Sequence, residues 1–264
     1  MPKIKEIKVT NNFILITLDD KRSFKISEDD YFEYKFKAET DLSDAEITNL
    51  ERISNFHAAY MRALNRIKYK DRTEYEIRQT VYDEFKLIKP EVDKIINKLK
   101  RYDYINDKRY LLELVERSQM KFHGYNKIKD SLIQVRINSN LIEEYLIYDE
   151  EKDFELATLF ATRSLKTIRN HNYSQTLNKL RSRLLYRGFN NGLITRVIEE
   201  INVAYNDSQE KDLLKKDFDK VFKRYQKQHE NFELTSRVFN YLASRGYSYE
   251  LINELLEEVE RNNE

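Results

Sequence analysis

The chain has 264 residues, and its 47 basic and 46 acidic side chains give a net charge of +1, so overall charge indicates no particular partner. Cysteine is absent, which excludes disulfides, thiolate metal sites and a cysteine nucleophile. With four Gly, two Pro and 35% charged residues, the composition favours exposed helices, and no apolar run reaches the roughly 20 residues that span a bilayer. We therefore expect a cytoplasmic, mostly helical protein that does not enter a membrane.

Residues 3–26 alternate apolar and polar side chains in the manner of β-strands, with breaks at Asn11-Asn12 and at residues 19–22. This pattern predicts a small antiparallel sheet. Ser43 and Glu46 then stand three residues apart, the spacing of a capping box in which each side chain accepts a hydrogen bond from the other residue's backbone N–H. A helix is predicted to begin there, and the helical period dominates the rest of the chain.

Large apolar residues follow one pattern four times: apolar, four residues, apolar, four residues, apolar, two residues, apolar-apolar. The four copies are Tyr82, Leu87, Val92, Ile95 and Ile96; Leu132, Ile137, Ile142, Tyr145 and Leu146; Leu184, Phe189, Ile194, Val197 and Ile198; and Leu242, Tyr247, Ile252, Leu255 and Leu256. The second residues of successive copies lie 50, 52 and 58 residues apart, which leaves room for three helices per copy. We predict a mostly α-helical fold: an N-terminal β-hairpin and helix segment at residues 1–52, then an elongated array of three-helix modules at residues 53–105, 106–149, 150–205 and 206–264.

Each copy of the pattern describes a helix, a tight turn and a second helix. In the third copy Leu184 ends one helix, Gly188 supplies a left-handed cap and Phe189 fills the turn. Gly246 repeats that cap in the fourth copy. The first copy has no Gly, but Pro90 suits the first turn of its second helix.

Three segments, in this order, carry a likeness to a known family. Residues 72–78, Arg-Thr-Glu-Tyr-Glu-Ile-Arg, are similar to Arg-Ser-Glu-x-Glu-Leu-Arg; residues 99–110 are similar to Leu-x-x-x-Gly-Tyr-Ile-Asp-Asp-x-x-Phe; and Gly124 with Ile128 matches Gly-x-x-x-Ile. Together with the fourfold pattern they resemble the RecX family of recombinase regulators over residues 57–262. The chain departs from the family pattern at Asp103 and Arg136, where Gly is usual, and at Asn106, where Asp is usual.

The resemblance implies a non-enzymatic inhibitor or modulator of the RecA recombinase in DNA repair and recombination. Such a protein lies along the groove of the RecA–DNA filament and restrains ATP hydrolysis, strand exchange or filament growth. We expect a monomer whose partners are the RecA filament and, weakly and without sequence preference, single- or double-stranded DNA.

The sharpest electrostatic feature is the stretch from Leu156 to Ile198, which contains no Asp or Glu. It carries eight cations, Arg163, Lys166, Arg169, Lys179, Arg181, Arg183, Arg187 and Arg196. Clustered cations release counterions and steer association, so this stretch predicts a face that binds DNA phosphates or an acidic recombinase surface. The alternative interpretation is a solvated helical surface.

A second, weaker basic set consists of Arg117, Lys121, Lys127 and Lys129 beside His123, and the same two interpretations apply to it. Four tyrosines at predicted module junctions, Tyr102, Tyr104, Tyr110 and Tyr125, suit either base stacking or core packing, and their position favours the core.

Catalytic constellations are missing from the sequence. The four His residues are far apart and the four Gly residues are scattered, so we predict no enzyme, no metal site and no cofactor. Two alternatives to a filament regulator stay open. One is a stand-alone helix-turn-helix-like DNA-binding protein that uses Asn190, Asn191, Thr195 and Arg196 after the turn at Phe189. The other is a helical adaptor without a role in nucleic-acid binding.

Overall fold

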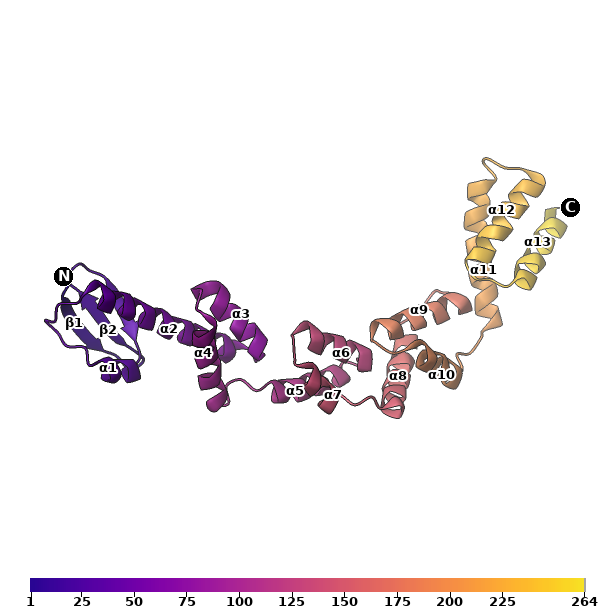
Figure 1. Cartoon of the computed structure of the whole chain (residues 1–264). Coiled ribbons are helices and arrows are strands. Elements are labelled where there is room, and N and C mark those ends of the chain that lie inside the picture. The colour runs from indigo at the N-terminus through magenta and orange to yellow at the C-terminus, as the bar shows by residue number, and fades with distance from the viewer. Residues whose placement is uncertain (264) are drawn as a thin grey trace. The chain divides into compact units, whose positions relative to one another are not determined.

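The computed structural model describes residues 1–263, which form thirteen α-helices and three β-strands. They divide into two compact units: Met1–Leu114 with Leu132–Tyr145, and Val115–Ser131 with residues 146–263. The mostly helical fold with a small N-terminal antiparallel sheet, predicted from the sequence, is confirmed (Figure 1).

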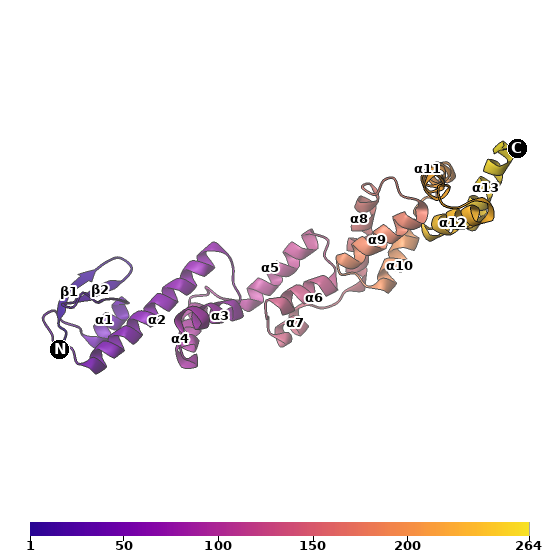
Figure 2. The ribbon, with the colours of Figure 1, turned by 90° about the horizontal axis from the view of Figure 1, so that it is seen from above.

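The first unit begins with a three-stranded antiparallel sheet in the order β1-β2-β3. Its elements are β1 (Ile4–Val9), β2 (Ile14–Leu18), β3 (Ser23–Ile26) and the short helix α1 (Glu28–Tyr34). Alternation along β2 buries Ile14, Ile16 and Leu18 on one face. The N-terminal part of α2 (Asp44–Tyr69) lies against that sheet, and Leu50 joins its core (Figures 1 and 2).

The capping box predicted at Ser43 and Glu46 is present, and a second capping box lies at the start of another helix. Ser43 and Glu46 form the box of α2, and Thr73 and Glu76 form that of α3 (Glu74–Phe85). Pro90 lies in the first turn of α4 (Lys89–Arg101), as predicted. The C-terminal part of α2 packs with α3 and α4 around a second core that includes Ile77, Ile95, Ile96 and Leu99.

The remaining helices are α5 (Asp107–Met120), α6 (Tyr125–Gln134), α7 (Ser139–Tyr145), α8 (Glu150–Leu165), α9 (Tyr173–Tyr186), α10 (Asn191–Ile201), α11 (Asp207–Tyr225), α12 (Asn231–Ser244) and α13 (Tyr249–Asn263). Helices α8, α9 and α10 enclose one core around Leu184, Phe189 and Val197. Helices α11, α12 and α13 enclose another around Leu242, Tyr247 and Ile252. The proposed module boundaries stay a prediction, and α2 runs without a break through residue 52.

The left-handed cap predicted at Gly188 and Gly246 is present, and the other two copies of the turn have it too. The filling residues Leu87, Ile137, Phe189 and Tyr247 are 4%, 5%, 2% and 4% exposed. The residue before each one has a left-handed backbone: φ is 53° at Lys86, 57° at Arg136, 89° at Gly188 and 90° at Gly246. The turn therefore fixes the backbone conformation, and a long flexible side chain occupies two of the four positions.

The first copy of the pattern is wrong in one residue. Tyr82 is 57% exposed, whereas Leu132, Leu184 and Leu242 of the other copies are fully buried. The neighbouring Val81 is fully buried, because the core-facing stripe of α3 runs through Ile77 and Val81.

Candidate functional site

A groove in the second unit brings together part of the predicted basic face. It has a volume of about 610 Å³ and lies between α8 and α9, with one residue from the turn before α6. Its lining residues are Phe122, Phe160, Arg163, Ser164, Thr167, Ser182, Arg183, Tyr186 and Arg187. Three of the eight predicted cations therefore line one concave surface.

Two aromatic rings form the floor of this groove and hold two of its cations. The rings of Phe122 and Phe160 have centroids 6.0 Å apart. The guanidinium of Arg163 lies 4.7 Å from the centroid of Phe122, and that of Arg187 lies 4.8 Å from that of Phe160. Each guanidinium is thus placed by a ring face and not by a carboxylate, so its positive charge is not cancelled.

The hydrogen bonds of Arg183 and Arg187 in the groove go to neutral acceptors. Arg183 Nη1 donates to the carbonyl oxygen of Ser164 at 3.1 Å and to the hydroxyl of Thr167 at 2.7 Å. Arg187 Nη1 donates to the carbonyl oxygen of Lys121 at 2.5 Å. These bonds orient the guanidinium groups without cancelling their charge.

Lys179, one turn before Arg183 on α9, lies outside the groove. Its Nζ is 2.5 Å from Nε2 of His171, which accepts the hydrogen bond.

Within residues 1–263, no carboxylate lies within ion-pair distance of Arg163, Arg183 or Arg187. The positive field is felt by His123, whose pKa is lowered first by burial and then by Arg187, Lys127 and Lys121. The groove is therefore an uncompensated cationic surface over an apolar floor, suited to a ligand with anionic groups.

Besides Lys179, four more of the eight predicted cations lie outside this groove. Arg196 forms ion pairs with Glu150 at 2.5 Å and Glu151 at 3.5 Å, so carboxylates of this chain balance its charge. Those two carboxylates begin α8, just before the acid-free stretch, and α10 brings Arg196 beside them. Lys166, Arg169 and Arg181 are exposed outside the groove lining, and Arg181 lies on a different face of α9 from Arg183 and Arg187.

The second basic set borders the groove only in part. Lys127 Nζ lies 5.0 Å from the ring centroid of Tyr186, a residue that lines the groove. Lys129 Nζ lies 5.9 Å from the ring centroid of Tyr125, which does not line it. Lys121 contributes its carbonyl oxygen to Arg187, while Arg117 is exposed on α5. Lys127 is therefore the member of this set that extends the groove's charge.

Phe122 reaches the groove because a pair of hydrogen bonds fixes the start of α6. The N–H of Tyr125 donates to Oδ2 of Asp153 at 3.1 Å, and the N–H of Gly124 donates to the carbonyl oxygen of Arg187 at 2.8 Å. We call this arrangement a joint, because it links the start of α6 to the three helices α8, α9 and α10: to α8 through Asp153, and to the turn between α9 and α10 through Arg187.

Two further joints have the same plan. In the first joint, the N–H of Glu74 donates to Asp107 at 2.8 Å, and the hydroxyl of Thr73 donates to the carbonyl oxygen of Val135 at 3.1 Å. In the third joint, the N–H of Tyr173 donates to Glu210 at 2.9 Å, and the side-chain amide of Asn172 donates to the carbonyl oxygen of Arg245 at 2.9 Å. The carbonyl acceptor always precedes the left-handed residue of the turn. Burial raises the pKa of Asp107, Asp153 and Glu210, as expected for desolvated carboxylates.

Sequence reasoning missed these joints, although a signal was present. A tyrosine stands five residues before each joint carboxylate, in Tyr102–Asp107, Tyr148–Asp153 and Tyr205–Glu210. The rings of Tyr148 and Tyr205 pack edge to face on Tyr125 and Tyr173, at 5.1 and 5.5 Å.

The prediction of core packing for the junction tyrosines is partly wrong. Tyr110 is 8% exposed and buried, and Tyr125 is half-buried, but Tyr102 and Tyr104 are 57% and 48% exposed. The first joint has Glu74 where the others have a tyrosine, so Tyr102 has no ring from the helix start to pack against.

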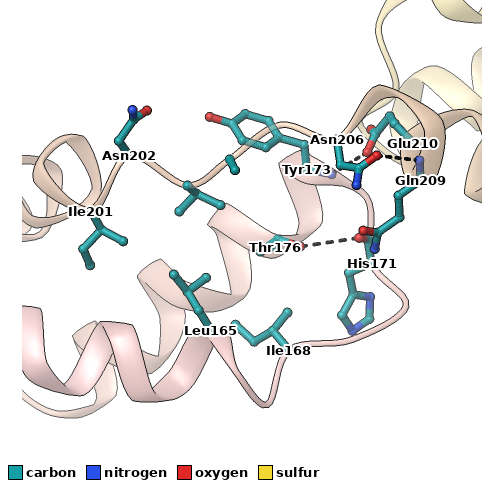
Figure 3. A pocket seen from close by; sticks show the side chains of 12 residues that line it. Leu165, Ile168, His171, Tyr173, Thr176, Ile201, Asn202, Asn206, Gln209 and Glu210 are labelled. Atoms are coloured by element: carbon teal, nitrogen blue, oxygen red, sulfur yellow. Dashed lines mark hydrogen bonds between the residues drawn. The ribbon is translucent and has the colours of Figure 1, made fainter.

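A smaller hollow of about 310 Å³ lies beside the third joint (Figure 3). Leu165, Ile168 and Ile201 supply apolar walls, and Glu210 points toward the backbone of Tyr173. Over residues 1–263 there is no group of three His, Asp or Glu side chains placed to hold a metal ion.

The helix-turn-helix alternative loses its main contacts. Asn190 accepts a hydrogen bond from the N–H of Leu193 as the cap of α10 and donates to the hydroxyl of Tyr148. With Arg196 held by two carboxylates, two of the four residues available for base contacts are engaged within the chain. Among the described helices, none combines the length and apolarity that crossing a bilayer requires.

Comparisons with known proteins agree with this architecture. A family model described as "RecX, third three-helix domain" matches residues 209–256. The "Regulatory protein RecX" of Lactococcus lactis subsp. lactis is 30% identical over 260 residues, covering 96% of this chain and 95% of the relative. That of Streptococcus gordonii is 26% identical over 260 residues, covering 96% and 98%. A crystal structure of regulatory protein RecX matches 75% of this chain and 100% of its own, with a TM-score of 0.58 and 22% identity, which supports the fold.

Proposed function

The chain belongs to the RecX family, and on this premise we propose that it binds the RecA–DNA filament and inhibits recombinase activity. Its relatives carry the name of regulatory proteins. We propose that it acts in the cytoplasm as a monomer built from four three-helix modules, without catalysing a reaction itself. Weak, non-specific contact with DNA accompanies binding of the recombinase.

The observation that carries this proposal is the groove formed by Arg163, Arg183 and Arg187 over Phe122 and Phe160. Cations without carboxylate partners are costly to keep close together, since like charges repel. A polyanionic partner relieves that repulsion and releases its own counterions. The aromatic floor adds apolar contact area, so the groove gains both electrostatic and hydrophobic free energy on binding.

The joint at Tyr125 gives this surface a fixed geometry. Because the bonds to Asp153 and Arg187 fix the start of α6, Phe122 stays against Phe160 without a partner present. A preformed surface loses less conformational entropy on binding than a mobile one. We propose that this rigidity lets the protein recognise a regular, repeating assembly by shape.

The test is DNA-dependent ATP hydrolysis by the cognate RecA with increasing amounts of the protein. We expect the parent chain to inhibit hydrolysis, and a variant with Arg163→Glu, Arg183→Glu and Arg187→Glu to require at least about tenfold more protein for the same inhibition. A matched variant with Lys5→Glu, Lys8→Glu and Lys94→Glu makes the same change in net charge at exposed residues outside the groove. Equal inhibition by both variants would rule out the groove, and no inhibition by the parent chain at saturation would rule out the proposed function.

Salt dependence separates DNA contacts from protein contacts. If the groove contacts about four phosphates of single-stranded DNA, a plot of the logarithm of the affinity against the logarithm of the salt concentration has a slope of about −3. An affinity that does not change with salt concentration would indicate that the groove contacts the recombinase and not DNA.

A further inference from the structure

A cluster of exposed tyrosines lies at the first joint, in the unit that does not contain the groove. Tyr102 and Tyr104 are 57% and 48% exposed, with ring centroids 6.0 Å apart and ring planes inclined by 35°. Tyr60 on α2 is half-buried, and its pKa is raised first by burial and then by the phenols of Tyr104 and Tyr102. The phenol rings of Tyr102 and Tyr104 therefore form an exposed pair after the end of α4.

Comparison of the three joints indicates that this cluster is open. At the second and third joints the linker tyrosine meets the tyrosine of the helix start at interplanar angles of 68° and 82°. In such a pair the edge of one ring covers the face of the other. At the first joint the helix start is Glu74, and its carboxylate is occupied by Arg78 and Lys100. Tyr102 and Tyr104 are instead tilted side by side, so their outer faces stay free for a planar ligand.

The charges around the cluster favour an anionic ligand. Lys98 Nζ lies 4.9 Å from the ring centroid of Tyr60 and 3.7 Å from Oδ2 of Asp29, so its charge is already paired. Arg101, next to Tyr102, is exposed and forms no ion pair with any described residue. The nearby carboxylate of Asp103 is bound by Arg109. A cationic or neutral aromatic side chain would leave Arg101 without a counter-charge, whereas a nucleotide offers a planar base and a phosphate together.

We propose that Tyr102 and Tyr104, with Arg101 next to them in the chain, form a stacking site for unpaired bases of a single nucleic-acid strand. Bases in a duplex are already stacked on their neighbours, so their faces are not available to these rings. The site is separate from the groove and does not depend on its proposed role.

The chain contains no tryptophan, so Tyr102→Trp introduces a single fluorescent reporter in the cluster. We expect short oligothymidylate to quench Trp emission from this variant at low salt. Tyr69→Trp is the matched control, because Tyr69 is 88% exposed at the end of α2 and belongs to no ring pair among the described residues. Emission from that variant should stay unchanged, and lack of quenching at position 102 would overturn the proposal.

Affinity for fluorescein-labelled oligothymidylate provides the second measurement. We expect the double variant Tyr102→Ala/Tyr104→Ala to bind at least about tenfold more weakly than the parent chain, while Tyr102→Phe/Tyr104→Phe keeps most of the affinity because it retains the ring faces. Arg101→Gln should weaken binding less. Parent affinity in the alanine pair, or equal affinity of the parent chain for a duplex of the same length, would contradict base stacking.

The two sites give distinguishable failures. If groove reversal abolishes inhibition of RecA while the alanine pair binds oligothymidylate like the parent chain, the stacking site is wrong and the proposed function stands. If oligothymidylate quenches the reporter and the parent chain does not inhibit RecA, the stacking site stands and the proposed function fails.

Discussion

The first and second joints each have one hydrogen bond to a carboxylate and one to a turn carbonyl, but one of the donors differs. At the second joint Gly124 and Tyr125 donate through their backbones, whereas at the first a hydroxyl, that of Thr73, replaces one backbone donor. The second joint has Gly188 in its turn and the first has Arg136, both with positive φ. The comparison teaches that the two acceptors, a carboxylate and a turn carbonyl, are kept, while the donor to the carbonyl can be a backbone N–H or a side-chain hydroxyl.

Gly188→Ala should produce the largest effect on this comparison. A Cβ at Gly188 would lie 2.4 Å from the N atom and 2.5 Å from the Cβ of Lys127, and φ is +89°. We expect the free energy of unfolding to fall by about 2–4 kcal/mol, from backbone strain and the clash with α6. Urea denaturation measures this change, and a loss below about 0.5 kcal/mol would show that the second joint is not tightly packed.

Removal of a joint carboxylate comes next. Asp153→Ala leaves the N–H of Tyr125 without its acceptor and should destabilise the chain by about 1–3 kcal/mol. Asp153→Asn keeps an acceptor oxygen and avoids burying a charge, so we expect a loss below about 1 kcal/mol. Hydrogen exchange should report faster exchange of the Tyr125 amide in the alanine variant and unchanged exchange at Tyr173. Equal stability of the alanine and asparagine variants would contradict a role for the hydrogen bond.

Arg136→Gly places in the turn of the first joint the residue that the second joint has at Gly188. Arg136 has φ of 57°, a conformation that glycine adopts without strain. We expect the variant to be more stable by about 0.5–1 kcal/mol, offset in part by the greater entropy of the unfolded chain. Thermal unfolding of the two proteins in parallel measures the difference, and a clear loss of stability would indicate that the Arg136 side chain contributes to the first joint.

The smallest effect concerns pH. Burial and nearby cations lower the pKa of His123 in the folded chain, so folding favours its neutral form. The resulting stabilisation is present above the unfolded-state pKa of about 6.5 and is lost as pH falls through the lower folded-state pKa. We expect the stability of the His123→Gln variant to decline less than that of the parent chain as pH falls below about 6.5, the unfolded-state pKa of histidine. Parallel stability curves would exclude a contribution from His123.

Local features of the fold could be predicted from the sequence. The capping boxes at Ser43 and Thr73 depend on residues three apart, and the turn-filling residues Phe189 and Tyr247 depend on helical periodicity. Both signals lie within one or two helical turns. The same periodicity misplaced Tyr82, because it does not say which of two neighbouring apolar residues faces the core.

The candidate site could be predicted only in part, because its contacts join distant residues. The acid-free stretch located Arg163, Arg183 and Arg187, but not their aromatic floor. Counting charges along the sequence also overlooked the contact of Arg196 with Glu150, 46 residues away. The exposed tyrosines were misjudged because a junction in sequence is not necessarily buried in space.

Photocrosslinking from the groove tests the central claim most directly. Tyr186 is 73% exposed in the groove lining, and a photoreactive phenylalanine analogue in its place reports on any molecule bound there. The same substitution at Tyr69, 88% exposed, is the control. With preassembled RecA–DNA filaments, the account predicts crosslinks to RecA or DNA from position 186, weakened by Arg183→Glu/Arg187→Glu, and none from position 69. Crosslinks from position 69 with none from position 186 would contradict it.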